Sequence, residues 1–249
     1  MAPLIAVAHG SRDPRSARVV VAAVAAIRAQ RPDLDVRLAF LDLTAPSVDR
    51  VVDAVAAEGH SAAVVVPLLL GSAFHARVDL PGILAGARAR HPRLALVQAD
   101  VLGGDPRLVG AVRDRVVAAG AAVDDPETGV VLAAVGSSHA AANRRVNRLT
   151  AVLSAGTRWS TSACFATAAQ PSVGQAISSL HAQGARRVVI APWFLAPGLL
   201  TDRLGDAALV ADPDVVFADP IGAHPNLAAV VFDRYAAAVR ATTGTRLSA

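Results

Sequence analysis

The chain contains an internal repeat, because its two halves match when one is placed over the other with an offset of 125 or 126 residues. The matched pairs are Gly10-Ser11 with Gly136-Ser137, Phe40 with Phe165, Pro46-Ser47-Val48 with Pro171-Ser172-Val173, and Pro67 with Pro192. A near-constant offset over several pairs indicates a duplicated domain. We therefore predict one domain over residues 1–123 and a second over 130–249, joined by a linker, 124–129, that is rich in turn-forming residues.

Short apolar runs alternate with alanine-rich helical stretches along both halves, which is the sequence form of βαβ units. The predicted strands are 4–8, 36–41, 62–70, 94–98, 130–135, 160–165, 187–192 and 215–218. The predicted helices are 16–30, 47–57, a stretch after 78, 107–119, 142–154, 172–183, 199–208 and 226–241. The pattern predicts an α/β protein in which each half is a small, mostly parallel sheet flanked by helices, with a cleft between the halves.

Composition excludes several classes of protein. The chain is 53% hydrophobic, but no run of about 18 apolar residues is free of charge, and the start lacks the basic region of a signal peptide. Its single cysteine, Cys164, rules out an internal disulfide and fits a cytoplasmic location. The basic residues are all arginines, and they are dispersed rather than clustered. We expect no nucleic-acid partner and no membrane association.

Three ionisable side chains follow three successive strands of the first half: His9, Asp42 and His75. Because parallel strands end at the same edge of a sheet, residues this far apart in sequence can meet there. Two imidazoles and a carboxylate suit a divalent transition metal, and they equally suit proton transfer near neutral pH. A structural zinc site is disfavoured by the lack of a cysteine pair, so we expect an open, weakly held metal.

The second half lacks this set of residues. Val135 stands at the position of His9, Thr167 at that of Asp42 and Leu200 at that of His75. We therefore expect the second domain to close the cleft and to bind the edges of a ligand without handling metal. His139 aligns with Asp13, and His224 is expected either to cap the last helix or to lie on the surface. Cys164 is expected to be a small buried residue, and Trp193 and Phe194 are expected in the core, with contact to a ligand as the alternative.

Several segments of the first half resemble the sirohydrochlorin chelatase family, which includes ferrochelatases and cobaltochelatases. They are Ala8–Pro14, Phe40-Leu41-Asp42 followed by Pro46-Ser47, and Val66 through Leu70 followed by His75 to Pro81. The resemblance covers nearly the whole chain, because two-domain members of this family are tandem repeats. It implies a chelatase that inserts a divalent metal into a metal-free tetrapyrrole and consumes no nucleotide.

By this resemblance, His9 and His75 handle the metal, together with Asp42 at a position that is commonly Glu in the family. The substrate carries many carboxylates, so the docking groups are expected to be Gly10, Ser11, Arg12, Ser72 and Arg77, with Arg15 as a further candidate. No permanent cofactor is implied. The metal substrate is Fe²⁺ or Co²⁺, with Fe²⁺ slightly favoured because sirohaem synthesis is widespread.

Two other functions remain open at this point. A non-enzymatic carrier of tetrapyrrole or metal would use the same cleft. A histidine-dependent phosphoryl-transfer enzyme would place His-Gly after its first strand, but Ala8 stands where such enzymes carry an arginine. We expect a monomer, because the duplication supplies an internal pseudo-twofold pair.

Overall fold

The computed structural model describes residues 1–71, 78–167 and 169–247, with residues 242–247 described for their backbone alone. The chain forms two compact units. Unit 1 comprises Met1–Gly103 and the chain from Ala223 onwards, and unit 2 comprises Gly104–Gly222.

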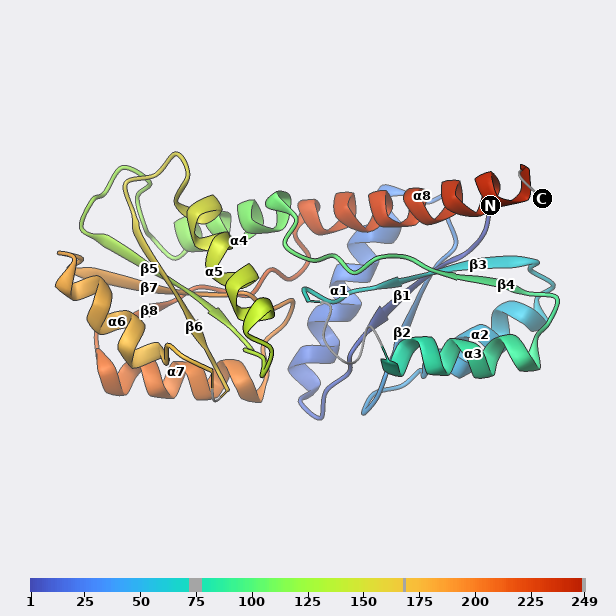
Figure 1. Ribbon diagram of the computed structural model, residues 1–249, viewed down its shortest axis with the longest axis horizontal. Helices are drawn as coiled ribbons and strands as arrows, with labels where there is room; N and C mark the ends of the chain where they lie inside the picture. Colours follow the sequence, from blue (N-terminus) through green and yellow to red (C-terminus); the bar gives the residue numbers. More distant parts are fainter. Residues whose placement is uncertain (72–77, 168, 248–249) are drawn as a thin grey trace. The chain divides into compact units, whose positions relative to one another are not determined.

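Unit 1 is a four-stranded parallel sheet with the strand order β2-β1-β3-β4, covered by helices on both faces (Figure 1). Helices α1 and α8 pack together on one face, and α2 and α3 pack together on the other. The elements are β1 (Leu4–Ala8), α1 (Pro14–Gln30), β2 (Val36–Phe40), α2 (Val48–Ala57), β3 (Ala62–Pro67), α3 (Leu80–Arg90), β4 (Ala95–Gln98) and α8 (Pro225–Leu247).

Unit 2 repeats this architecture with the strand order β6-β5-β7-β8, again parallel throughout. Helices α4 and α5 pack together, and α6 packs with α7 (Figure 1). The elements are α4 (Pro106–Ala118), β5 (Thr128–Ala134), α5 (Ala140–Ser154), β6 (Ser160–Phe165), α6 (Val173–Ala182), β7 (Arg187–Pro192), α7 (Leu199–Ala211) and β8 (Val216–Phe217).

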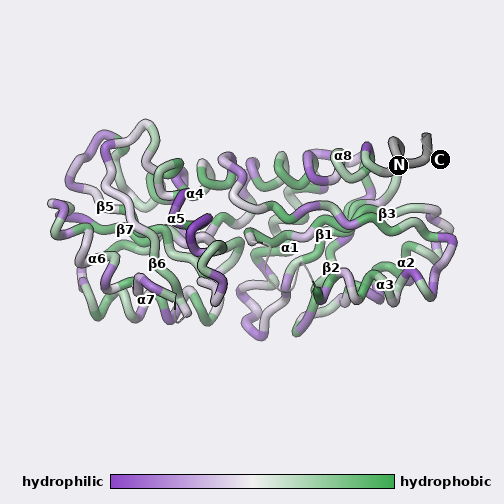
Figure 2. Tube along the Cα trace, viewed as in Figure 1, coloured by the Kyte–Doolittle hydropathy of each residue, from purple (hydrophilic) through white to green (hydrophobic). Residues whose placement is uncertain are grey.

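Burial on both faces explains why the strands are continuous apolar runs. All five residues of β1 and all seven of β5 are buried, as expected for a parallel sheet covered on both sides. Figure 2 shows this hydrophobic character along β3, whereas hydrophilic residues lie in the connecting loops and on helices such as α5. Side-chain caps fix where several helices begin: Asp13 accepts from Arg15 N at the start of α1, and Ser47 accepts from Arg50 N at the start of α2.

The predicted fold class is confirmed, and the predicted strands and helices are present with small differences at their ends. The strand predicted over 62–70 ends at Pro67, because β1 ends at Ala8; beyond Pro67 one more hydrogen bond forms, in which Leu68 N donates to Val7 O at 2.7 Å. Among the described residues, no helix has both the length and the apolarity needed to cross a membrane.

The division into compact units differs from the division predicted at 124–129. Helix α4 packs with α5 and β7 of unit 2, and α8 packs with α1, β3 and β4 of unit 1. Side chains anchor each helix in its unit: Arg113 donates to Leu153 O at 3.0 Å, and Arg234 donates to Leu102 O at 3.0 Å. The last helix of each sequence half therefore belongs to the other compact unit. The predicted linker is also shorter than expected, because Thr128 is the first residue of β5 and is fully buried.

Candidate functional site

Backbone hydrogen bonds bring His9 and Asp42 together at the carboxyl edge of the first sheet. Strand β1 pairs with β2 up to Ala8 and Phe40, and the pairing continues one step further, where Asp42 N donates to His9 O at 3.0 Å. Parallel pairing therefore places the two residues side by side although they are 33 positions apart. Both side chains are exposed.

The loops that follow these strands are held in close contact. Gly10 has φ +95°, and a Cβ at this position would lie 1.7 Å from the carbonyl oxygen of Asp42, so glycine is required here. Thr44 Oγ1 accepts from Ser11 N and donates to Ser11 O, both at 3.1 Å. Leu43 has φ +60° within a tight turn in which Thr44 N donates to Asp42 O at 2.7 Å. Gly10 and Ser11, which we predicted to dock substrate, thus have a structural role in holding together the loops that contain His9 and Asp42.

A cavity of about 320 Å³ lies at this edge, lined by His9, Leu41, Asp42, Asp79 and Ile83. Asp79 is an acidic residue of the cavity wall that we did not predict, because an aspartate just before Leu80-Pro81 is typical of the start of a helix. The side chains share the cavity walls without closing around one point, since they do not form a group with ligand atoms within 4.8 Å of one another. Imidazole and carboxylate groups that line an open cavity can bind a cation from solution and accept protons.

The other predicted site residues have mixed outcomes. Ser72, His75 and Arg77 lie outside the described residues. Arg12 is exposed on the loop after His9. The guanidinium of Arg15 is bound to the carboxylate of Asp13, with Nε 3.0 Å from Oδ2, and these hydrogen bonds hold the pKa of Asp13 below its usual value. Arg15 is therefore engaged within helix α1, and a role in docking would require it to leave Asp13.

Unit 2 repeats the backbone of this site without its ionisable groups. Thr167 N donates to Val135 O at 3.1 Å, which matches the bond between Asp42 and His9, and Gly136 has φ +87°, close to that of Gly10. A cavity of about 490 Å³ lies here, and its described lining residues are all neutral: Ser137, Ser138, Ala140, Asn143, Thr167, Ala169 and Gln170. The predicted alignment of His9 with Val135 and of Asp42 with Thr167 is confirmed.

The remaining residues singled out in the sequence have structural roles. Asn226 N donates to His224 Nδ1 at 3.2 Å, so His224 caps α8 as predicted. Trp193 is buried, and Phe194 packs against the core of unit 2. Cys164 is fully buried in the same core, and burial raises the pKa of its thiol to about 12. His139 is exposed at the start of α5 and makes no side-chain cap.

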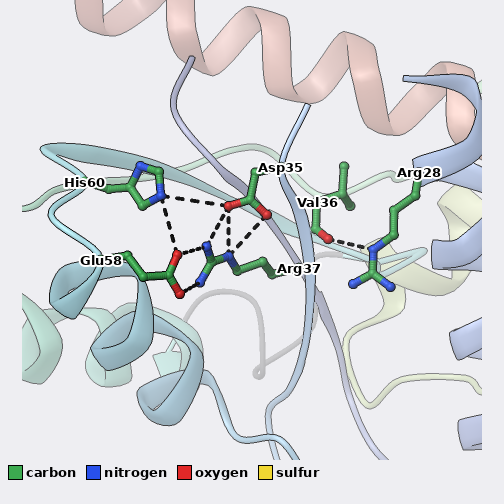
Figure 3. Close-up of polar contacts among 6 residues, drawn as sticks. All are labelled: Arg28, Asp35, Val36, Arg37, Glu58 and His60. Atoms are coloured by element: carbon green, nitrogen blue, oxygen red, sulfur yellow. Dashed lines mark hydrogen bonds and ion pairs between the residues drawn. The ribbon is translucent and has the colours of Figure 1, made fainter. Parts of the chain in front are cut away.

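A second cluster of potential metal ligands lies away from the cavity, at the amino end of β2 (Figure 3). Within the part of the chain that the structure describes, it alone brings three such side chains within 4.8 Å of one another: Asp35, Glu58 and His60. Arg37 binds both carboxylates, with Nε 2.9 Å from Asp35 Oδ2 and Nη1 2.9 Å from Glu58 Oε1. The bond from Arg37 also lowers the pKa of Glu58. A guanidinium already satisfies these acids, so the cluster is an ion-pair network.

Together, the fold and the cavities define a class of protein: a tandem α/β repeat in which unit 1 presents imidazole and carboxylate groups at a sheet edge and unit 2 presents a neutral pocket. The CbiX family model matches residues 3–119 and 129–238. The chain belongs to the CbiX family, with one copy of the family domain in each half. The two matches leave residues 120–128 between them, near the linker predicted from the repeat.

Similar proteins of known function and structure cover almost the whole chain. The sirohydrochlorin ferrochelatase of Priestia megaterium is 28% identical over 93% of this chain and 88% of that protein. The sirohydrochlorin cobaltochelatase of the same organism is 26% identical over 94% of this chain and 79% of that protein. The structure of SirB from Bacillus subtilis with Fe³⁺ superposes with a TM-score of 0.82, at 26% identity and 98% coverage of both chains.

Proposed function

We propose that the protein is a chelatase that inserts Fe²⁺ or Co²⁺ into sirohydrochlorin without consuming a nucleotide. The observation that carries the proposal is the cavity at the carboxyl edge of the first sheet, where strand pairing brings His9 beside Asp42. The activities of the similar Priestia megaterium proteins support it.

The reaction makes two chemical demands. The incoming cation must exchange bound water for pyrrole nitrogens, and two N–H protons must leave the macrocycle, so that M²⁺ and the free base give the metal complex and two H⁺. The imidazole of His9 can accept a proton. The carboxylate of Asp42 balances the charge of the cation while water is lost.

We further propose that His75 supplies the second imidazole and that Gly10, Ser11, Arg12, Ser72 and Arg77 dock the carboxylates of the substrate. The exposure of Arg12 beside His9 supports its part in this assignment, because a guanidinium pairs well with a carboxylate. Unit 2 would contact substrate without handling metal, since the described residues that line its cavity are neutral.

Fe²⁺ is our preferred metal. The donor groups themselves give little preference between Fe²⁺ and Co²⁺, because neighbouring first-row metals bind imidazole and carboxylate sites with similar affinity. The similar proteins include both a ferrochelatase and a cobaltochelatase of Priestia megaterium, so the preference for iron rests on how widespread sirohaem synthesis is.

The test is an anaerobic assay in which the absorbance of free-base sirohydrochlorin is followed with Fe²⁺, with Co²⁺ and with both in competition. We expect the protein to accelerate the loss of the free-base spectrum over the spontaneous rate with at least one metal, and iron to be inserted preferentially in the competition. Tight binding of the tetrapyrrole with no acceleration by either metal would refute the chelatase and favour a carrier.

A further inference from the structure

Helix α5 carries a positive charge that no acid of the helix balances. Although the arginines are dispersed over the chain as a whole, Arg144, Arg145 and Arg148 fall within this one helix, which contains no aspartate or glutamate. Their spacing places them on one face of the helix, and all three are exposed. Figure 2 shows strongly hydrophilic residues along α5. We call the surface of these three residues the arginine face.

No described residue neutralises the arginine face. Several other exposed arginines pair with acids: Arg90 Nη2 lies 3.3 Å from Asp53 Oδ1, and Arg186 Nε lies 3.1 Å from Glu127 Oε1. In the part of the chain that the structure describes, the three arginines of α5 form no ion pair and donate no side-chain hydrogen bond. Their guanidinium groups are therefore available to an anion from solution.

The internal repeat shows that this charge is not required by the fold. Residues 128–201 contain no aspartate or glutamate, whereas the matching residues of the first half, 3–76, contain seven. At the start of the equivalent helix α1, the carboxylate of Asp13 binds Arg15, and His139 stands at the position of Asp13 in the second half. Unit 2 thus keeps a positive charge at a place where unit 1 balances it, and such a surface attracts polyanions.

The cavity of unit 2 adjoins the arginine face, because Asn143, the residue just before it, lines the cavity. The volume of about 490 Å³ is in the range of small-molecule sites. The lining also offers neutral hydrogen-bond donors, among them the hydroxyl groups of Ser138 and Thr167. Gln170 adds its NH₂ group, because its Oε1 already accepts from Ser172 N at 3.2 Å. Neutral donors beside available guanidinium groups suit a ligand with several carboxylates.

We propose that the arginine face and the adjoining cavity bind carboxylate groups of the tetrapyrrole substrate, an assignment that rests on the proposed chelatase function. It names the residues with which unit 2 holds the substrate. A nucleic acid fits this surface less well, because the arginine face extends only about 6 Å along the helix axis, at 1.5 Å per residue. In addition, α5 has no aromatic residue on which a base could stack.

The test is a titration of the full chain with metal-free sirohydrochlorin, followed by the absorbance of the tetrapyrrole, in the wild type and three variants. The triple variant Arg144→Gln/Arg145→Gln/Arg148→Gln removes the three charges, and glutamine retains a good helix propensity. Arg144→Gln removes one charge. Its matched control is Arg158→Gln, because Arg158 is also an exposed arginine of unit 2 but lies before β6, at the opposite edge of the sheet. Circular dichroism checks that each variant is folded.

We expect the triple variant to bind sirohydrochlorin at least about tenfold more weakly than the wild type, and Arg144→Gln to bind about two- to fivefold more weakly, since each exposed ion pair contributes a few-fold in affinity. Arg158→Gln should bind like the wild type. Added NaCl should weaken binding less in the triple variant, because fewer charges take part.

Three outcomes would overturn the inference. They are an unchanged affinity in the triple variant, the same loss of affinity in Arg158→Gln as in Arg144→Gln, and no binding of sirohydrochlorin to the wild type.

The metal-insertion assay separates this inference from the proposed function. If the wild type accelerates insertion while the triple variant keeps full affinity for sirohydrochlorin, the chelatase stands and the role of the arginine face is wrong. If the wild type binds sirohydrochlorin through the arginine face but accelerates insertion of neither metal, the binding surface stands and the chelatase is wrong.

Discussion

The carboxyl edges of the two sheets share a backbone and differ in chemistry. Each has a left-handed glycine after its first strand, at φ +95° for Gly10 and +87° for Gly136, and each continues the strand pairing by one further hydrogen bond. The cavity of unit 1 is lined by a histidine and two aspartates, whereas the described lining of the unit 2 cavity is neutral.

This difference separates what the fold needs from what the chemistry needs. Features present at both edges maintain the sheet edge itself. They are the glycine and the loop after the second strand, which Phe40 N closes by donating to Pro46 O in unit 1 and Phe165 N closes by donating to Pro171 O in unit 2. His9 and Asp42 are replaced in the second copy without loss of the backbone geometry, as the bond from Thr167 N to Val135 O shows. Their side chains are therefore not required for folding and are free to serve the reaction.

The largest expected effect concerns two histidines that follow the first strands of the two sheets, His9 after β1 and His139 after β5. We predict that His9→Ala lowers the rate of metal insertion by about a hundredfold or more, the usual contribution of a positioned proton acceptor. His139→Ala should keep the wild-type rate within about twofold, since His139 is exposed beside a cavity whose described lining has no ionisable group. The loss of the free-base spectrum of sirohydrochlorin measures both rates.

Circular dichroism and thermal unfolding of the same variants provide the control, and His9→Ala should unfold like the wild type. A collapse of the rate in His139→Ala with an unaffected His9→Ala would show that the chemistry belongs to unit 2.

The next effect concerns the glycines. Alanine at position 10 would place its Cβ 1.7 Å from the backbone oxygen of Asp42. At position 136 the Cβ would lie 2.7 Å from the side-chain oxygen of Thr167, which can rotate away, and 2.9 Å from the Cβ of Phe165, which requires a small shift of the chain. We predict that Gly10→Ala destabilises unit 1 by about 2–4 kcal/mol and Gly136→Ala destabilises unit 2 by about 1–2 kcal/mol. Urea unfolding monitored separately in each unit by hydrogen exchange would measure the two values.

Gly59→Ala is the matched control, because Gly59 also has a positive φ, +83°, but has nothing within 4 Å of an added Cβ. It should show the cost of the backbone conformation alone. The rate of metal insertion should fall in Gly10→Ala and persist in Gly136→Ala. Equal losses of stability at positions 10, 136 and 59 would show that the close approach of residue 10 to the Asp42 carbonyl adds nothing to the cost of the positive φ.

Most of the fold could be predicted from the sequence, because buried parallel strands are continuous apolar runs and the repeat aligns one half with the other. The pairing of His9 with Asp42 was predictable for the same reason, since topology alone brings the ends of neighbouring parallel strands together. The positions of Trp193 and Cys164 in the core also followed from their place in the pattern.

Other features depend on packing that a sequence pattern does not contain. The exchange of α4 and α8 between the compact units results from contacts such as those of Arg113 and Arg234 with distant carbonyl groups. The engagement of Arg15 by Asp13 depends on side-chain conformation. The place of Asp79 in the cavity depends on the backbone before α3, where Val78 and Asp79 are already helical.

The smallest expected effect concerns the pH dependence of stability in the two units. In each unit, a hydrogen bond between a histidine and an aspartate connects two neighbouring helices. In unit 1, His91 at the end of α3 bonds Asp53 of α2 at 2.6 Å; in unit 2 the order is reversed, and His181 of α6 bonds Asp212 at the end of α7 at 3.0 Å. The bond from His91, with help from Arg90, lowers the pKa of Asp53 below 3.8. Bonds to Ala185 O and then to Asp212 raise the pKa of His181 above 6.5.

These shifts predict opposite pH dependences in the two units. A raised histidine pKa stabilises the folded state below pH 6.5, and this contribution is lost as the pH rises through the folded pKa; a lowered aspartate pKa stabilises it above pH 3.8, and this is lost as the pH falls through the folded pKa. His181→Gln should therefore reduce the loss of stability of unit 2 as the pH rises above about 6.5, and Asp53→Asn should reduce the loss of stability of unit 1 as the pH falls below about 3.8. Since both side chains are well exposed, each change should be about 0.5 kcal/mol or less. Hydrogen exchange, measured for each unit as a function of pH, would detect the change in stability. An equal response of both units to either substitution would show that each hydrogen bond affects the whole protein and not its own unit alone.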